Sequence, residues 1–296
     1  MLTKIVDAAQ TVLPGDRIEE DAEARAMREE GRADVSPFDQ ALRDRSRDTL
    51  QMVEEALDAQ RGVLAYQPVM IAEGKGRTAF HEGLIRIQDP GGRIIPAADF
   101  MDAVEDREAG RRIDALALEI GLRELRSQPD LRLSINMSAR SIGYRPWMEA
   151  LETGLSADPT AAERLILEIT EQSAMTMPEL VISFMADLSD RGIAFALDDF
   201  GAGMTSFRYL RDFYFDVMKI DRSYVSGIQH SPDDRALIAA MIAVARHFEM
   251  LVVAENVEEA EEMRVLIDLG VDCLQGFYFA APSLTPPWRA DAREAG

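Results

Sequence analysis

The feature that most constrains the fold is an alternation of short apolar segments with longer amphipathic ones, from residue 63 almost to the C-terminus. Eight segments have the length and composition of strands: 63–69, 79–87, 132–137, 165–170, 194–199, 216–220, 251–255 and 273–277. Stretches with helical spacing lie between most of them, at 111–126, 177–191, 232–248 and 257–269. Eight strands with intervening helices, over about 225 residues, predict a TIM-like (β/α)8 barrel.

An open, doubly wound parallel sheet would show the same alternation. A sheet of that kind that binds a dinucleotide carries Gly-x-Gly-x-x-Gly after its first strand. No such run follows residues 63–69, so the barrel is favoured.

The first part of the chain has a different character. Residues 16–34 are dense in Glu, Arg and Ala, which is typical of a solvated helix or a mobile arm. A break at Ser36-Pro37 is followed by helical spacing over 39–59. We predict an acidic, helical or mobile N-terminal arm over 1–47, the barrel domain over 48–286 and a C-terminal tail over 287–296.

Composition excludes several classes of protein. The formal net charge of −21 argues against a non-specific binder of nucleic acid polymers or anionic membranes. A single cysteine, Cys273, excludes a disulfide framework and a Cys-rich zinc site. The uncharged run 236–245 is far shorter than the ~20 residues that span a bilayer, and the N-terminus lacks the apolar core of a signal peptide. We expect a cytoplasmic protein without a membrane span.

Most of the predicted strands contain or end in a polar residue that an ordinary core strand would not carry. A single carboxylate at a strand end more often caps a helix or faces solvent. Here the polar residues recur along successive strands: Glu82, Asn136, Glu168, Asp198, Asp199, Lys219, Glu255 and Gln275. Because the C-terminal strand ends of a βα barrel converge on one mouth, these side chains are predicted to share one pocket.

Five of these eight side chains are carboxylates, which cannot ionise together in a small site without positive charge. Lys219 supplies one charge, and hard divalent cations with oxygen ligands, including the Asn136 carbonyl, would supply the rest. No cluster of His or Cys accompanies them, which argues against zinc. The adjacent pair Asp198-Asp199 suits two ions ~3.5–4 Å apart, the arrangement used for in-line displacement at phosphorus.

The same residues lie in motifs that resemble the EAL domain family, which hydrolyses the bacterial messenger cyclic di-GMP. The resemblance covers roughly residues 64–282 and rests on eight ordered motifs. They are YQPV (66–69), HEGLIR (81–86), SINMSA (134–139), LEITE (167–171), LDDFGAGMTSFRYL (197–210), DVMKID (216–221), VVAENVE (252–258) and LQGFYFAAP (274–282). The resemblance implies a barrel whose first strand runs antiparallel to the others.

The resemblance also implies a role for each matching residue. Glu82, Asn136, Glu168 and Asp198 would ligate one Mg²⁺ or Mn²⁺, and Asp198, Asp199 and Glu255 would hold a second ion. Lys219 would orient or activate the attacking water, Gln275 would hold a water or ligand, and Glu171 would brace the loop after the fifth strand. Gln67, Arg86 and Asp216 would contact substrate. The implied reaction opens cyclic di-GMP to linear pGpG, with either Glu255 or Lys219 taking the proton, and the implied assembly is a homodimer.

The chain departs from the family pattern outside the proposed ligands. Gly83 stands where alanine is usual, Asn256 replaces a glycine, and Phe207 replaces a leucine; the loop reads Ala202, Met204 and Thr205 where Thr, Tyr and Ser are commoner. Three functions therefore stay open. They are an active phosphodiesterase, a catalytically weak or inactive cyclic di-GMP receptor that signals through a partner, and a barrel hydrolase of another phosphodiester.

Overall fold

A computed structural model describes residues 36–73, 76–203 and 210–289. The chain divides into two compact units, Met1–Asp48 and Thr49–Gly296. In the first unit, the described residues form the beginning of helix α2 (Pro37–Asp58), where Arg47 and Asp44 make an exposed ion pair. The arm predicted over 1–35 and the loop residues Met204, Thr205 and Phe207 lie outside the described residues.

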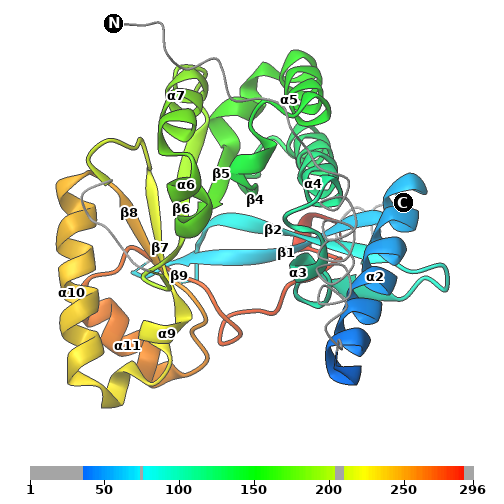
Figure 1. Cartoon of the computed structure of the whole chain (residues 1–296). Coiled ribbons are helices and arrows are strands. Elements are labelled where there is room, and N and C mark those ends of the chain that lie inside the picture. The colour runs from blue at the N-terminus through cyan, green and yellow to red at the C-terminus, as the bar shows by residue number, and fades with distance from the viewer. Residues whose placement is uncertain (1–35, 74–75, 204–209, 290–296) are drawn as a thin grey trace, which may run out of the picture. The chain divides into compact units, whose positions relative to one another are not determined.

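The second unit contains a closed eight-stranded barrel, which confirms the predicted fold (Figure 1). Its strands are β1 (Gly62–Ile71), β2 (Thr78–Gln88), β4 (Leu133–Asn136), β5 (Leu165–Thr170), β6 (Ala194–Phe200), β7 (Val217–Ile220), β8 (Leu251–Ala254) and β9 (Cys273–Leu274). Strand β1 runs antiparallel to both of its neighbours, β2 and β9, and the other barrel strands pair in parallel. A short strand, β3 (Ile94–Pro96), pairs with the end of β2 outside the barrel.

Helices flank the barrel strands (Figure 1). They are α3 (Met101–Val104), α4 (Glu108–Ser127), α5 (Arg145–Ala157), α6 (Glu171–Thr176), α7 (Pro178–Ser189), α9 (Arg222–Val225), α10 (Pro232–His247) and α11 (Ala260–Leu269). Side-chain caps fix where several of them begin: Thr170 accepts from the backbone N–H of Ser173 at α6, and Ser231 accepts from that of Asp234 at α10. None of the described helices combines the length and the apolar composition that crossing a membrane requires.

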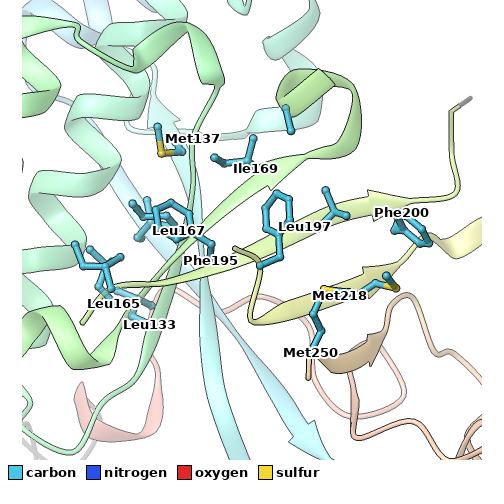
Figure 2. Close-up of a cluster of buried hydrophobic side chains, with 14 of the residues drawn as sticks. Leu133, Met137, Leu165, Leu167, Ile169, Phe195, Leu197, Phe200, Met218 and Met250 are labelled. Atoms are coloured by element: carbon cyan, nitrogen blue, oxygen red, sulfur yellow. The ribbon is translucent and has the colours of Figure 1, made fainter. Parts of the chain in front are cut away.

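Strand alternation places apolar side chains on both faces of the barrel wall. Side chains that point outward, such as Leu133, Leu167 and Phe195, pack against the helices (Figure 2). Inside the barrel, toward the amino ends of the parallel strands, six buried side chains form an apolar plug: Val69, Phe80, Ala196, Val217, Val253 and Cys273. The next inward position on each strand, two residues away, is the polar residue predicted to form the site. The barrel therefore carries a charged layer directly above an apolar one.

Candidate active site

Lys219 on β7 lies at the centre of the charged layer. Its ammonium nitrogen is 2.6 Å from Glu168 Oε2, 2.7 Å from Glu255 Oε1, 3.1 Å from Asp198 Oδ1 and 3.4 Å from Glu82 Oε2. The lysine is only 1% exposed, so these interactions are poorly screened by water. The structure thus brings one buried cation into contact with four carboxylates that lie on, or directly after, four different strands.

Neutral side chains complete the layer around Glu82. Asn136 Nδ2 donates to Glu82 Oε1 over 2.8 Å, and Gln275 Nε2 donates to Glu82 Oε2 over 2.7 Å. Gln275 also donates to Gln67 Oε1, and Gln67 Nε2 in turn donates to the carbonyl of Ala280 over 3.0 Å. Both ends of the Gln67 amide are therefore paired with other parts of the chain at the mouth.

The charges in this layer do not balance. Burial, followed by repulsion from Glu82, raises the pKa of Glu168 to about 8. Burial also raises the pKa of Glu255 well above its ordinary value, although Lys219 opposes the shift. Burial lowers the pKa of Lys219, but the surrounding carboxylates outweigh it and keep the lysine charged. One ammonium therefore does not neutralise the carboxylates, and the site favours additional positive charge.

The donor set fits a divalent cation. One carboxylate oxygen from each of Asp198, Asp199 and Glu255 lies within 4.8 Å of the other two. Glu168 Oε1 and Gln275 Oε1 are buried and make no hydrogen bond within the described chain. Buried acceptors without donors are costly, and a hard cation satisfies them. Because every one of these donors is oxygen, the set suits ions such as Mg²⁺ rather than zinc held by nitrogen and sulfur.

Glu171 and the loop after β6 lie beside this cluster. Glu171 Oε2 accepts the backbone N–H of Gly201 over 3.2 Å, and Tyr224 Oη donates to the Gly201 carbonyl over 3.1 Å. Asp199 itself has a left-handed backbone with φ of 52°. The start of α6 therefore contacts the loop that follows Asp199 and the end of β6.

Asn256 follows Glu255 and holds a left-handed backbone with φ of 54°. Asparagine tolerates this conformation better than other non-glycine residues, and a β-branched residue tolerates it least. Asn256→Val is expected to lower the free energy of unfolding by about 1–2 kcal/mol, whereas Asn256→Gly should change it by less than about 1 kcal/mol. Parallel urea denaturation of the two variants measures this, and equal stabilities would show that the backbone there is unstrained.

A pocket of about 340 Å³ opens beside the charged layer. Residues of β2, the segment 97–106, α4, the turn after β4 and α6 line it, and Asn136 and Gly83 join it to the mouth. Leu84, Ile85, Met101, Ile113 and Met137 form apolar walls, and Asp114, Ser138 and Arg140 provide polar groups. Arg86, predicted to contact substrate, lies two residues beyond Leu84 on β2 and is half-buried. The pocket combines apolar walls with a few polar groups, as binding sites for small molecules do.

Asp114 is absent from the site predicted from the sequence. It lies on the buried face of α4, where its Oδ2 accepts the Ser138 N–H over 2.9 Å and the Ser141 hydroxyl over 2.6 Å. Burial raises its pKa to about 6 in spite of these hydrogen bonds. The available signal was a lone carboxylate in the apolar stripe formed by Ile113 and Leu118.

Asp114 should make protein stability depend on pH. Its folded pKa of about 6 exceeds the model-peptide value of 3.8, so its stabilising contribution is complete below 3.8 and is lost as the pH rises through about 6. The asparagine variant does not lose this contribution. When the pH is raised from about 4.5 to about 7.5, the free energy of unfolding of Asp114→Asn minus that of the unmodified chain should therefore increase by about 2 kcal/mol. Urea denaturation at both pH values tests this, with exposed Asp102→Asn as control; a pH-independent difference would contradict it.

The structure does not bring Asp216 to the mouth, contrary to the predicted substrate contact. Asp216 precedes β7, and its Oδ2 accepts the backbone N–H of Phe195 near the start of β6 over 2.8 Å. It therefore supports strand pairing at the amino end of the barrel, opposite the site.

Asp221, which the prediction omitted, lies two residues after Lys219 and so has the same inward parity. Its negative charge helps to raise the pKa of Asp199, although burial and the charge of Asp198 contribute more. Period-two alternation from Lys219 would have indicated it.

Comparison with known proteins places this geometry in a family. The sequence model of the EAL domain matches residues 50–282. The chain is 28% identical over 273 residues to the bifunctional diguanylate cyclase/cyclic di-GMP phosphodiesterase MucR of Pseudomonas aeruginosa, covering 90% of this chain and 40% of that protein. It is 31% identical over 234 residues to the cyclic di-GMP phosphodiesterase PdeR of Escherichia coli, covering 78% of this chain and 35% of PdeR.

Solved structures agree with the sequence comparison. A structure described as PaMucR phosphodiesterase in complex with c-di-GMP superposes with a TM-score of 0.73 and 28% identity, covering 82% of this chain and 99% of that one. The FimX EAL domain of Pseudomonas aeruginosa bound to c-di-GMP, 24% identical with a TM-score of 0.72, shares the fold. The chain spans between 29% and 40% of the length of the first curated relatives. Because the sequence model of the EAL domain matches residues 50–282, which contain all eight barrel strands, the chain belongs to the EAL domain family.

Proposed function

We propose that this chain hydrolyses cyclic di-GMP to linear pGpG, with water attacking one phosphodiester in line at a two-metal site. The observation that carries the proposal is the convergence of four carboxylates on buried Lys219 at the barrel mouth, next to a pocket. Membership of the EAL domain family supports it, as do relatives named cyclic di-GMP phosphodiesterases.

The proposed ligands are Glu82, Asn136, Glu168 and Asp198 for one Mg²⁺ or Mn²⁺, and Asp198, Asp199 and Glu255 for a second. When bound, such ions would activate water and neutralise charge on the phosphoryl oxygens. The need for them follows from electrostatics, because an anionic dinucleotide would otherwise approach a layer with more carboxylates than cations.

The chain's own side chains have separate tasks in this proposal. Lys219, kept charged by the carboxylates, holds Glu168 and Glu255 in place and could release a proton, whereas Glu255 lies where a proton could be taken up. Gln275, fixed by Gln67, would orient water or ligand at the mouth. Arg86 would contact a phosphate. Asp216 has no part in the proposed site.

The pocket beside the mouth would receive one guanine base. Leu84, Met101 and Ile113 provide apolar walls for its faces. Ser138 and Ser141 both donate to Oδ2 of the Asp114 carboxylate; its other oxygen, which makes no hydrogen bond among the described residues, would accept N–H groups from the base edge. This placement would anchor the substrate while its phosphodiester lies over the charged layer.

Chromatography of the products tests the proposed reaction. The chain is incubated with cyclic di-GMP and either Mg²⁺ or Mn²⁺, with EDTA as the metal-free control. Formation of pGpG that depends on metal supports the proposal. Binding of cyclic di-GMP without product under either metal would replace it with a receptor function, and absence of binding would point to another phosphodiester.

The proposed setting is a cytoplasmic homodimer that contacts through the barrel. The mass measured by light scattering, with and without cyclic di-GMP, tests the assembly. A monomer under both conditions would overturn the dimer without affecting the proposed reaction.

A further inference from the structure

The chain continues past the matched family region, which ends at residue 282, and returns to the barrel. Ser283 forms an antiparallel bridge with Tyr66 of β1: Tyr66 N donates to the Ser283 carbonyl over 2.8 Å, and Ser283 N donates back over 3.0 Å. The following residues bring Trp288 and Arg289 against the outside of the barrel. We call the segment 283–289 the C-terminal clasp.

The clasp is held by a buried carboxylate on α4. Glu124 accepts from Trp288 Nε1 over 2.7 Å, from Arg289 Nε over 3.1 Å and, through its other oxygen, from Arg289 Nη2 over 2.6 Å. Burial alone would raise the pKa of Glu124, but the hydrogen bonds from Arg289 and Trp288 outweigh it and lower the pKa. A carboxylate held by three donors in this way is a strong, geometrically specific anchor.

The clasp contacts the two strands that carry Gln67 and Glu82. The Trp288 ring packs edge-on against Tyr66, with centroids 5.3 Å apart, and against His81, with centroids 4.6 Å apart. The Arg289 guanidinium lies 5.2 Å from the centre of the Tyr66 ring and donates to its hydroxyl over 3.2 Å. Tyr66 immediately precedes Gln67, and His81 immediately precedes Glu82. Because successive side chains of a strand point to opposite faces, the clasp packs on the outer face of the two strands whose inner face carries Gln67 and Glu82.

The barrel needs this support because its closing seam is short. Strand β9 pairs with β1 at only two positions, Met70–Leu274 and Ile71–Cys273. Toward the mouth, β1 is joined to the chain after β9 by hydrogen bonds of Gln67 with Gln275 and Ala280 and by the bridge from Tyr66 to Ser283. The part of β1 that faces the site is therefore paired with β2 on one edge, whereas on its other edge the clasp takes the place of a continuous ladder.

We propose that the C-terminal clasp positions β1 and β2 for catalysis, with Trp288 and Arg289 acting as positioning residues for Gln67 and Glu82. This inference rests on the proposed phosphodiesterase function. Displacing the two strands would move Glu82 relative to its partners Asn136, Gln275 and Lys219, and supports behind a metal ligand are typically worth about 10–100-fold in metal affinity or activity.

Kinetics of full-length variants test the clasp. Arg289→Ala is compared with Arg289→Lys, which keeps the charge, and with Arg264→Ala, which removes an exposed arginine paired with Glu261. We expect Arg289→Ala to lower kcat and raise the Mg²⁺ concentration for half-maximal activity by about tenfold, Arg289→Lys to recover part of both, and Arg264→Ala to change neither. Circular dichroism establishes that each variant is folded at the assay temperature. A folded Arg289→Ala protein with unchanged kcat and Mg²⁺ dependence would overturn the proposal, because a purely stabilising clasp affects only the melting temperature.

Fluorescence tests the clasp independently of turnover. The chain has two tryptophans, and Trp147→Phe leaves Trp288 as the sole tryptophan, which excitation at a wavelength that tyrosine does not absorb observes alone. If the clasp is coupled to the site, adding Mg²⁺ alone should shift Trp288 emission, and the shift should vanish in Glu82→Ala. If calorimetry shows that Mg²⁺ binds but the emission maximum of Trp288 does not change, the proposed coupling is wrong. If the unmodified chain shows this shift but never cleaves cyclic di-GMP, the proposed function fails while the clasp is supported.

Discussion

Glu82→Ala is expected to reduce hydrolysis of cyclic di-GMP by about a thousandfold or more. Glu82 accepts hydrogen bonds from Asn136 and Gln275 and lies 3.4 Å from the ammonium of Lys219, so its loss removes both a proposed ligand and the acceptor that these three side chains share. The rate of pGpG formation at saturating Mg²⁺ measures the effect.

Two further variants make the Glu82 result specific. Glu82→Gln keeps the shape and removes the charge, and it should be nearly as inactive if the carboxylate ligates a cation. Glu119→Ala removes an exposed carboxylate on α4 and should be fully active. Retention of more than about a tenth of the activity by Glu82→Ala would refute the assigned role.

Lys219→Met should abolish turnover and also destabilise the fold. The variant leaves four carboxylates, all within 3.4 Å of the former ammonium, buried without their cation. Breaking a buried ion pair from one side costs about 3–5 kcal/mol, so the unfolding free energy measured in EDTA should fall by about that amount. Because Mg²⁺ would supply the missing charge, it should stabilise the variant more than it stabilises the unmodified chain.

Urea denaturation with EDTA or Mg²⁺ distinguishes this electrostatic effect from simple loss of packing. Arg123→Met, which alters an exposed arginine, is the control and should unfold like the unmodified chain under both conditions. Equal stabilisation of Lys219→Met and the unmodified chain by Mg²⁺ would show that lysine and metal do not share the same carboxylates.

The barrel and most of its charged layer could be predicted from sequence because both follow from a period of two. Once a strand is located, the inward face is fixed, and Glu82, Glu168 and Lys219 then share one side of their strands. Asp216 differs, because only the resemblance implies its contact with substrate; the strand predicted over 216–220 begins at Asp216, and the structure likewise has it at the amino end of β7.

Features built from distant segments were not accessible in the same way. The pocket joins β2, α4 and α6, and its volume depends on side-chain packing that no local pattern encodes. The clasp depends on Glu124 meeting Trp288 and Arg289 across more than 160 residues. The sequence predicts the barrel domain up to residue 286 and a tail from 287, because a short terminal segment carries no periodic signal that would identify the clasp.

The charged layer above the apolar plug has a consequence for how such a barrel can diverge. Like-charged side chains held together oppose folding, whereas apolar residues of similar volume in the same positions would fill the layer as the plug does. A descendant released from catalysis could therefore become more heat-resistant by losing its acids one at a time. The same property suits this barrel as a scaffold for engineering, because replacing the clustered acids at its mouth is expected to increase the stability of the fold.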